Sequence, residues 1–255
     1  MPTNDTLTIV LTLVSAAATG LMGGFALMKR MTLAGDVISH VALPGIGVAL
    51  LLQVNPIWGA AVALFFGTLL IWKLEQFGSL ATETAIGVIF TAAVAIGALI
   101  TSEEELIEAL FGGLGEVTPT FFVIGVLATL LVVGVLLKMK GKLLLGLFSP
   151  DLAIATGVNL RKLNLIYLLL FSVTILLGLR FLGALLVGSL IITSGAIARQ
   201  LTHNLHSFLL ISSASSVLAV GLGMFFSAQY GTDLGPTIVA VAAGLFCFSL
   251  LKKKW

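Results

Sequence analysis

The sequence has 255 residues, of which 59% are hydrophobic and 9% are charged, and its net charge is +2. A soluble domain carries about 25% charged residues, so a soluble fold of this composition would expose large apolar patches and aggregate. The composition therefore excludes a soluble enzyme and indicates an all-α, polytopic integral membrane protein. Because no polar linker divides the chain, residues 1–255 are expected to form a single transmembrane domain.

A membrane-spanning helix needs about 20 mostly apolar residues. Asn55 and Pro56 form a turn between the second and third candidate runs, and Pro236 suits the start of the last one. Only Arg180 separates the sixth run from the seventh, so this pair is either two full spans or includes one short or re-entrant helix. We therefore expect about nine transmembrane helices, with eight as the alternative. The nine runs are 7–28, 37–53, 56–72, 84–101, 119–137, 163–179, 181–198, 207–227 and 235–251.

The basic residues are distributed asymmetrically along this threading. If the N-terminus lies outside and nine spans follow, twelve of the thirteen Lys and Arg residues fall on the inner side, and only Arg180 falls outside. Cytoplasmic segments of membrane proteins carry an excess of Lys and Arg. The expected orientation therefore has the N-terminus outside and the C-terminus in the cytoplasm.

The inner segment after the fifth run is longer than a turn requires. Ser149 is a suitable N-cap, Pro150 suits the first helical turn, and Asp151 favours the positive end of the helix dipole. Gly157 would end such a helix. The segment 149–158 is therefore expected to be a short cytoplasmic helix that docks a partner, with a plain amphipathic loop as the alternative.

Six segments of the sequence carry a family resemblance. They are GDVISHVALPGIGVALLL at 35–52, TETAIGVIFTAAVAIGAL at 82–99, LFGGLGEVTP at 110–119, SPDLAIATGVN at 149–159, FLGALLVGSLIITSGAIAR at 181–199 and GPTIVAVAAGLFCFSLL at 235–251. In this order they resemble the metal-uptake ABC permeases, the ABC-3 family that imports zinc, manganese or iron into bacteria. The resemblance covers nearly the whole chain. The sequence departs from the family pattern at Thr193-Ser194-Gly195, where the family usually has Pro-Ala.

The resemblance implies a type II ABC importer-like fold and the role of permease subunit for a divalent metal ion in the bacterial inner membrane. Zinc is the first expectation and manganese the second, because the VTP and SPDLA strings are slightly closer to zinc permeases. The implied partners are a second copy of the chain, cytoplasmic ABC ATPase subunits, an extracytoplasmic metal-binding protein and membrane lipid. No nucleic acid and no bound cofactor are expected.

The residues agree independently on the need for an ATPase. No phosphate-binding loop of the form G-x-x-x-x-G-K-[ST] occurs in the sequence, so the chain is not expected to hydrolyse ATP itself. The resemblance assigns the short helix at 149–158 to contact with that ATPase. The residues in that assignment are Ser149, Pro150, Asp151, Ala153 and Gly157.

Asp36 and His40 are the candidate metal-ligating residues. They are four residues apart, so on a helix they share one face with Cβ atoms about 5–6 Å apart. Lys29 and Arg30 mark the inner interface, which places His40 roughly 15 Å into the membrane. An ionisable group at that depth indicates a function, and imidazole and carboxylate both bind zinc, while carboxylate also suits manganese.

In a twofold dimer the pair would supply up to four ligands. The alternative is a neutral His40 that bonds to Asp36 and holds two helices together.

The other candidate residues have simpler interpretations. His203 and His206 have a spacing that suits metal, although interfacial histidines near lipid headgroups are the simpler interpretation. The run Glu103–Glu108 would concentrate cations or meet a binding protein, with a solvated acidic loop as the alternative. Gly20 and Gly24 form a small-xxx-small pair that suits close helix packing.

Two other classes of function compete with the importer. A secondary transporter driven by an ion gradient would need further carboxylates inside the spans, and only Asp36 lies clearly within one. A non-transporting membrane scaffold would use Asp36 and His40 structurally and would have no ATPase to bind. Co-purification with an ATPase separates the importer from both alternatives.

Overall fold

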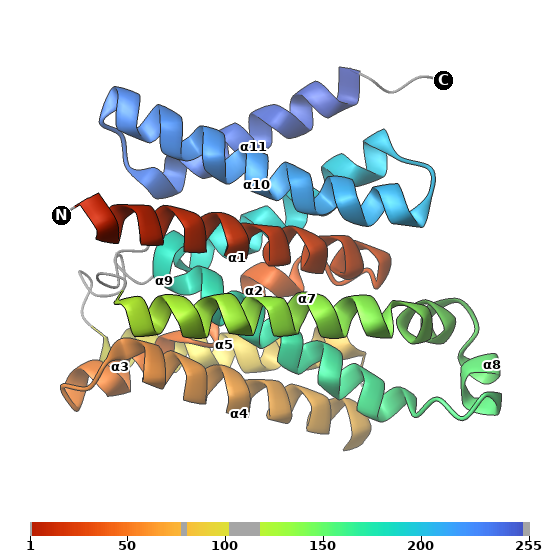
Figure 1. The fold of residues 1–255 in the computed structure, drawn as a ribbon. Helices are drawn as coiled ribbons and strands as arrows, with labels where there is room; N and C mark the ends of the chain where they lie inside the picture. Colours follow the sequence, from red (N-terminus) through yellow and green to blue (C-terminus); the bar gives the residue numbers. More distant parts are fainter. Residues whose placement is uncertain (1, 78–80, 102–117, 252–255) are drawn as a thin grey trace.

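The computed structural model describes residues 2–77, 81–101 and 118–251, and within these ranges every regular element is an α-helix (Figure 1). Eight helices in this part of the chain are long and apolar enough to cross a membrane. The prediction of an all-α, polytopic membrane fold is confirmed. The helices are α1 (Pro2–Met28), α2 (Ala34–His40), α3 (Leu43–Leu51), α4 (Pro56–Phe77), α5 (Thr82–Ile100), α7 (Pro119–Phe148), α8 (Pro150–Ala155), α9 (Leu160–Leu201), α10 (Leu205–Tyr230) and α11 (Leu234–Leu251).

Several helix starts coincide with the breakers in the sequence. α4 begins at Pro56 and α7 at Pro119, where the missing N–H of proline costs nothing because the first turn has no partner for it. The hydroxyl of Thr118 caps α7 by accepting a hydrogen bond from the amide of Phe121 at 3.3 Å. These boundaries were predictable because they depend on local chemistry alone.

The fifth predicted span is much longer in the structure than in the sequence-based prediction. The apolar run ends at 137, whereas α7 continues to Phe148. The extension contains Lys, Leu and Met, which are strong helix formers, and Leu143 within it is buried. Hydropathy marks where a helix leaves the hydrocarbon and does not mark where the helix itself ends.

The chain reverses direction within α9, at Gly183. Gly183 has φ 78° and ψ 165°, which is outside the helical region. A Cβ atom at Gly178 would clash with the side chain of Val187, although nine residues of straight helix would hold the two about 13 Å apart. The first part of α9 crosses the membrane at Leu160–Leu179, and a shorter apolar helix follows at Leu186–Leu201. Of the two alternatives for the sixth and seventh predicted runs, the structure therefore has the one with a full span followed by a short helix.

α9 is the central element of the bundle and packs against α1, α2, α4, α7, α10 and α11. Small residues allow the closest approaches: a Cβ at Gly195 would lie 2.7 Å from the carbonyl oxygen of Gly23 in α1. Gly20 and Gly24 also face close neighbours, but these belong to α10 of the same chain. Figure 1 shows that α1 starts at the end of the bundle opposite to α8, whereas α11 runs back toward the α8 end.

Candidate functional site

The short helix α2 is placed by a tight turn after α1. Arg30 adopts φ 59°, a left-handed conformation that is uncommon outside glycine. Its amide donates to the carbonyl of Leu27 at 3.1 Å, and the amide of Met31 donates to Ala26 at 2.8 Å, which together form a Schellman-type end to α1. α2 starts three residues after Met31, at Ala34. The turn therefore brings α2 back into the bundle, where it packs against α9 and α5.

Asp36 lies in the first turn of α2 and touches the backbone of α9. A Cβ atom at Gly188 would lie 2.6 Å from Cα and 2.9 Å from Oδ1 of Asp36. Only glycine fits at position 188 without displacing Asp36.

His40 is the last residue of α2, one turn after Asp36. Its Nδ1 atom lies 2.8 Å from the carbonyl oxygen of Asp36, and the hydroxyl of Ser39 donates to the same oxygen at 2.6 Å. A carbonyl oxygen only accepts, so Nδ1 carries the proton and Nε2 of a neutral ring carries the lone pair. This arrangement is the one that orients a histidine for metal binding through Nε2.

The imidazole of His40 also contacts an aromatic ring of α5. The ring centroids of His40 and Phe90 are 5.5 Å apart, with an angle of 87° between the planes. Such an edge-to-face contact holds a ring in one orientation. Two independent contacts thus fix the plane of the His40 ring.

The helix is interrupted directly after His40. α2 ends there and α3 starts at Leu43, with Pro44 in its first turn. Proline has no N–H, so Pro44 cannot donate to the carbonyl of His40 four residues earlier. Pro44 thus accounts for the break, which places His40 at a helix end inside the bundle.

Together these contacts define what the pair can do chemically. The hydrogen bonds of Ser39 and His40 both use the backbone carbonyl of Asp36 and do not involve its carboxylate. The alternative in which His40 bonds to the Asp36 side chain to join two helices is therefore not the observed geometry. Among the described residues no group of three or more His, Cys, Asp or Glu side chains gathers. Within the described ranges, Asp36 and His40 are therefore the two side chains of this kind that the site offers.

The predicted docking segment forms α8, which starts at Pro150 and has Asp151 in its first turn. The side chain of Ser149 makes no capping hydrogen bond, so that detail of the prediction is wrong. Gly157 ends the segment with φ +80° as predicted, and the amide of Val158 donates to the carbonyl of Ala153 at 2.9 Å. Ala153 is fully buried within the chain.

The outward face of α8 is apolar. Leu152 and Ile154 are 52% and 62% exposed, and neither was singled out from the sequence. The segment around Glu103–Glu108 lies outside the described residues. His203 and His206 are exposed at the junction of α9 and α10.

Sequence reasoning missed two residues that build the site around Asp36 and His40, namely Gly188 and Phe90. The signal for Gly188 is present as the small residues of GALLVGSL, but a small residue does not reveal which helix it contacts. Phe90 lies in an apolar run in which any aromatic residue is unremarkable.

The fold agrees with comparisons to known proteins. The sequence model described as the ABC 3 transport family matches residues 6–253. The chain belongs to this family. Its relatives include the high-affinity zinc uptake system membrane protein ZnuB of Haemophilus influenzae, 32% identical over 252 residues, which are 96% of this chain and 95% of the relative.

Other relatives carry a different metal in their names. The manganese transport system membrane protein MntC of Halalkalibacterium halodurans is 32% identical over 90% of this chain and 80% of its own length. The structure resembles a chain of PsaBC from Streptococcus pneumoniae, solved in complex with Fab, with a TM-score of 0.82 and 25% identity over 96% of this chain and 90% of that one.

Proposed function

We propose that this chain is the permease subunit of an ABC importer that moves a divalent metal ion across the bacterial inner membrane. The observation that carries the proposal is the pair Asp36 and His40 within the membrane-spanning segment Ala34–Leu51. The Nδ1 atom of His40 donates a hydrogen bond to the backbone carbonyl of Asp36, which leaves Nε2 available to bind a metal. A bare ion inside hydrocarbon must exchange its water ligands for protein ligands, and this pair supplies them.

The metal we propose is zinc first and manganese second. An imidazole nitrogen and a carboxylate oxygen are both good zinc ligands, and the carboxylate also suits manganese. The family relatives named above carry zinc or manganese in their names. The ion is the substrate of the transporter and is not a resident cofactor of the chain.

A second copy of the chain would complete the site. Four protein ligands are usual for zinc, whereas Asp36 and His40 make two. A twofold axis next to α2 would bring both pairs together and supply four ligands. The site would then exist only in the dimer, and it would open when the two copies move apart.

The proposed orientation has the N-terminus outside and the α8 end of the bundle in the cytoplasm. Lys29 and Arg30 follow α1, while Arg161 and Lys162 lie in the first turn of α9, and both places are at the α8 end. An excess of basic residues on one side supports a cytoplasmic position for that side. Because α11 runs toward the same end, the C-terminus would also be cytoplasmic (Figure 1).

α8 would then contact a cytoplasmic ABC ATPase. Leu152 and Ile154 would insert into a groove of that subunit, with Asp151 next to them at the positive helix end. Ser149, Pro150 and Gly157 would belong to the same contact segment, and the buried Ala153 would shape it from inside. An extracytoplasmic metal-binding protein would deliver the ion at the opposite face.

The test is reconstitution of the chain with its ATPase in proteoliposomes. The proposal predicts uptake of zinc or manganese that requires ATP, both subunits and the binding protein, while calcium and magnesium are not taken up. Metal uptake that persists without the ATPase would instead identify a secondary transporter. An absence of uptake of every divalent metal, despite ATP hydrolysis by the assembled complex, would contradict the proposal.

A further inference from the structure

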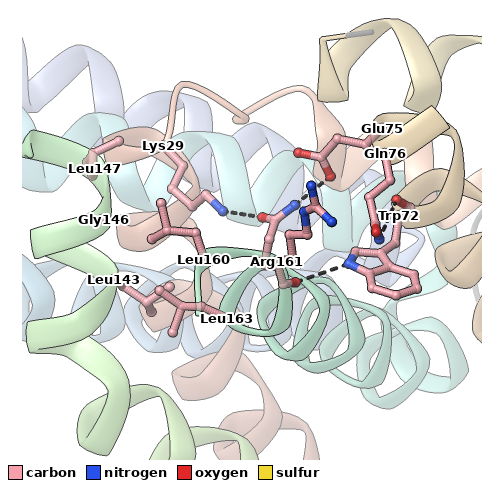
Figure 2. Close-up of a pocket in the computed structure, with 11 residues that line it drawn as sticks. Lys29, Trp72, Glu75, Gln76, Leu143, Gly146, Leu147, Leu160, Arg161 and Leu163 are labelled. Carbon is pink, nitrogen blue, oxygen red and sulfur yellow. Dashed lines mark hydrogen bonds between the residues drawn. The ribbon is translucent and has the colours of Figure 1, made fainter. Parts of the chain in front are cut away.

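A polar cluster lies at the α8 end of the bundle, outside the candidate metal site and α8 itself. It consists of Lys29, Glu75, Thr82 and Asn164, and we call it the Lys29 cluster. Lys29, Glu75 and Asn164 line a cavity of about 450 Å³, which Figure 2 shows between α1, α4, α7 and the start of α9. Lys29 directly follows α1, and the other three residues lie in α4, α5 and α9.

The cluster is connected by short hydrogen bonds. The Nζ atom of Lys29 donates to Oδ1 of Asn164 at 2.6 Å, and Nδ2 of Asn164 donates to Oε2 of Glu75 at 2.6 Å. The hydroxyl of Thr82 donates to the other carboxylate oxygen of Glu75 at 2.8 Å. Both bonds of Asn164 involve an ionised partner, and such bonds are the strong ones. Asn164 is therefore the central residue that joins α1 to α4.

The environment of Lys29 makes this bond costly to break. Its Nζ atom lies 4.2 Å from the centre of the Tyr167 ring, and Tyr167 is fully buried. Burial lowers the pKa of Lys29 to about 8, while Glu75 acts in the opposite direction. In such surroundings of low dielectric, the hydrogen bond from a cation to its acceptor is stronger than it would be in water. The inner ends of α1 and α9 are therefore expected to move together.

Asn164 is rigidly connected to α8. Only four residues separate α8 from α9, and hydrogen bonds fix them at both ends. Gly157 and Val158 close the end of α8 through bonds of 2.9 Å to Ile154 and Ala153. The side chain of Asn159 caps α9 by accepting from the amide of Lys162 at 3.0 Å. Asn164 follows in the second turn, so a displacement of α8 carries Asn164 with it.

Lys29 is also close along the chain to the candidate metal site. It directly follows α1, and Asp36 lies seven residues further along the chain. The intervening segment is held by the turn at Arg30 and by the bond from the amide of Ala34 to Met31 at 3.1 Å. One side-chain hydrogen bond thus connects the α8–α9 junction to the segment that leads into α2.

We propose that Asn164, together with Lys29 and Glu75, is a positioning residue that transmits displacement of α8 to α2 and so to Asp36 and His40. The proposal rests on the proposed function, because it assumes that an ATPase moves α8 and that α2 carries the substrate metal. The cluster would not touch the metal. It would set whether ATP hydrolysis at one end of the bundle changes the geometry of the ligands in its interior.

The test compares metal ions moved per ATP hydrolysed in proteoliposomes that contain the full complex. Asn164→Ala is expected to lower this ratio about fivefold or more, in the range typical of coupling between two sites, while the yield of the ATPase complex stays unchanged. Trp72→Phe is the matched control. The Trp72 indole donates to the carbonyl of Arg161 at 3.1 Å, so its removal loosens α4 from α9 at the same place without affecting Lys29.

A double variant keeps the test decisive if Asn164→Ala fails to assemble. Asn164→Asp combined with Glu75→Gln preserves the net charge. Lys29 can still donate to the side chain at position 164, and the amide at position 75 can now donate to the carboxylate at position 164. It is expected to restore the ratio of the unaltered complex. Loss of coupling in the assembled double variant would overturn the proposal.

The same assay separates the two proposals. Suppose that the unaltered complex moves metal and that Asn164→Ala moves as many metal ions per ATP as Trp72→Phe does. Asn164 then does not transmit displacement of α8, and the proposed function stands. If the unaltered complex moves no metal, the proposed function itself fails.

Discussion

The Nδ1 atom of His40 lies 2.8 Å from the carbonyl oxygen of Asp36, inside a helix of only seven residues. This bond selects the tautomer of the ring and leaves Nε2 as the atom that can bind a metal. The edge-to-face contact with Phe90 holds the ring plane as well. The candidate site is therefore preorganised within one chain, and Asp36 and His40 are the two ligands that the described part of that chain brings to it.

The contact between Gly188 and Asp36 yields the first prediction. Gly188→Ala places a methyl group within 3 Å of three atoms of Asp36 and must displace α2 or α9. Because supporting residues around a metal site typically contribute 10- to 100-fold in affinity, metal binding is expected to weaken by about that factor. Binding is measured by calorimetry on the purified complex.

Gly134→Ala serves as the control for this substitution, since a Cβ atom at Gly134 meets nothing within 4 Å. Equal affinities for the two variants would show that close packing on Asp36 has no role in the site.

The exposed face of α8 gives the second prediction. Replacing both Leu152 and Ile154 with Ser removes two apolar side chains that are 52% and 62% exposed in the isolated chain. If the ATPase covers them, its affinity for this chain should fall about tenfold or more. The measurement is the amount of ATPase retained on the tagged permease.

Thr156→Ala changes the same segment without removing an outward apolar side chain, and it should retain the ATPase. Normal retention by the Leu152 and Ile154 variant would place the ATPase contact elsewhere.

Two glycines with opposite backbone requirements give the third prediction. Gly157 has φ +80°, where a Cβ atom is strained, so Gly157→Ala should destabilise the chain by about 1 kcal/mol. Gly141 lies inside α7 with nothing near its Cβ position, so Gly141→Ala should stabilise it by up to about 1 kcal/mol. Thermal unfolding in detergent measures both changes, and shifts of the same sign would contradict the assignment.

The lowered pKa of Lys29 gives a prediction on pH. Burial lowers this pKa from 10.5 to about 8, so between these values the unfolded chain holds more protons on Lys29 than the folded chain does. The free energy of unfolding contributed by Lys29 therefore rises as the pH increases through this window and is constant below it. Lys29→Met removes the effect.

The melting temperature of the unaltered chain should therefore rise relative to that of Lys29→Met as the pH increases above about 8. A difference that does not change with pH would show that the pKa of Lys29 is not lowered.

The sequence predicted most of the helices because each spanning segment must satisfy its backbone hydrogen bonds internally and must be apolar along its whole length. The starts at Pro56 and Pro119 were accurate for the same local reason. The end of α7 at Phe148 was missed, because helix propensity continues beyond the apolar run.

Contacts between distant parts of the chain could not be predicted in this way. The bond from Lys29 to Asn164 joins residues 135 positions apart, and neither residue has a distinctive local pattern. The spacing of Asp36 and His40 correctly predicted a shared helical turn. It did not predict that His40 would bond to the backbone of Asp36 rather than to its carboxylate.

The most direct test of metal transport through Asp36 and His40 is uptake of radioactive zinc and manganese by complexes that carry Asp36→Ala or His40→Ala, measured alongside the yield of the assembled complex. Both variants are expected to assemble with the ATPase in normal amounts, and their uptake is expected to fall to the level of liposomes without protein. Full uptake by either assembled variant would contradict this expectation, because the metal would then cross the membrane without these two ligands.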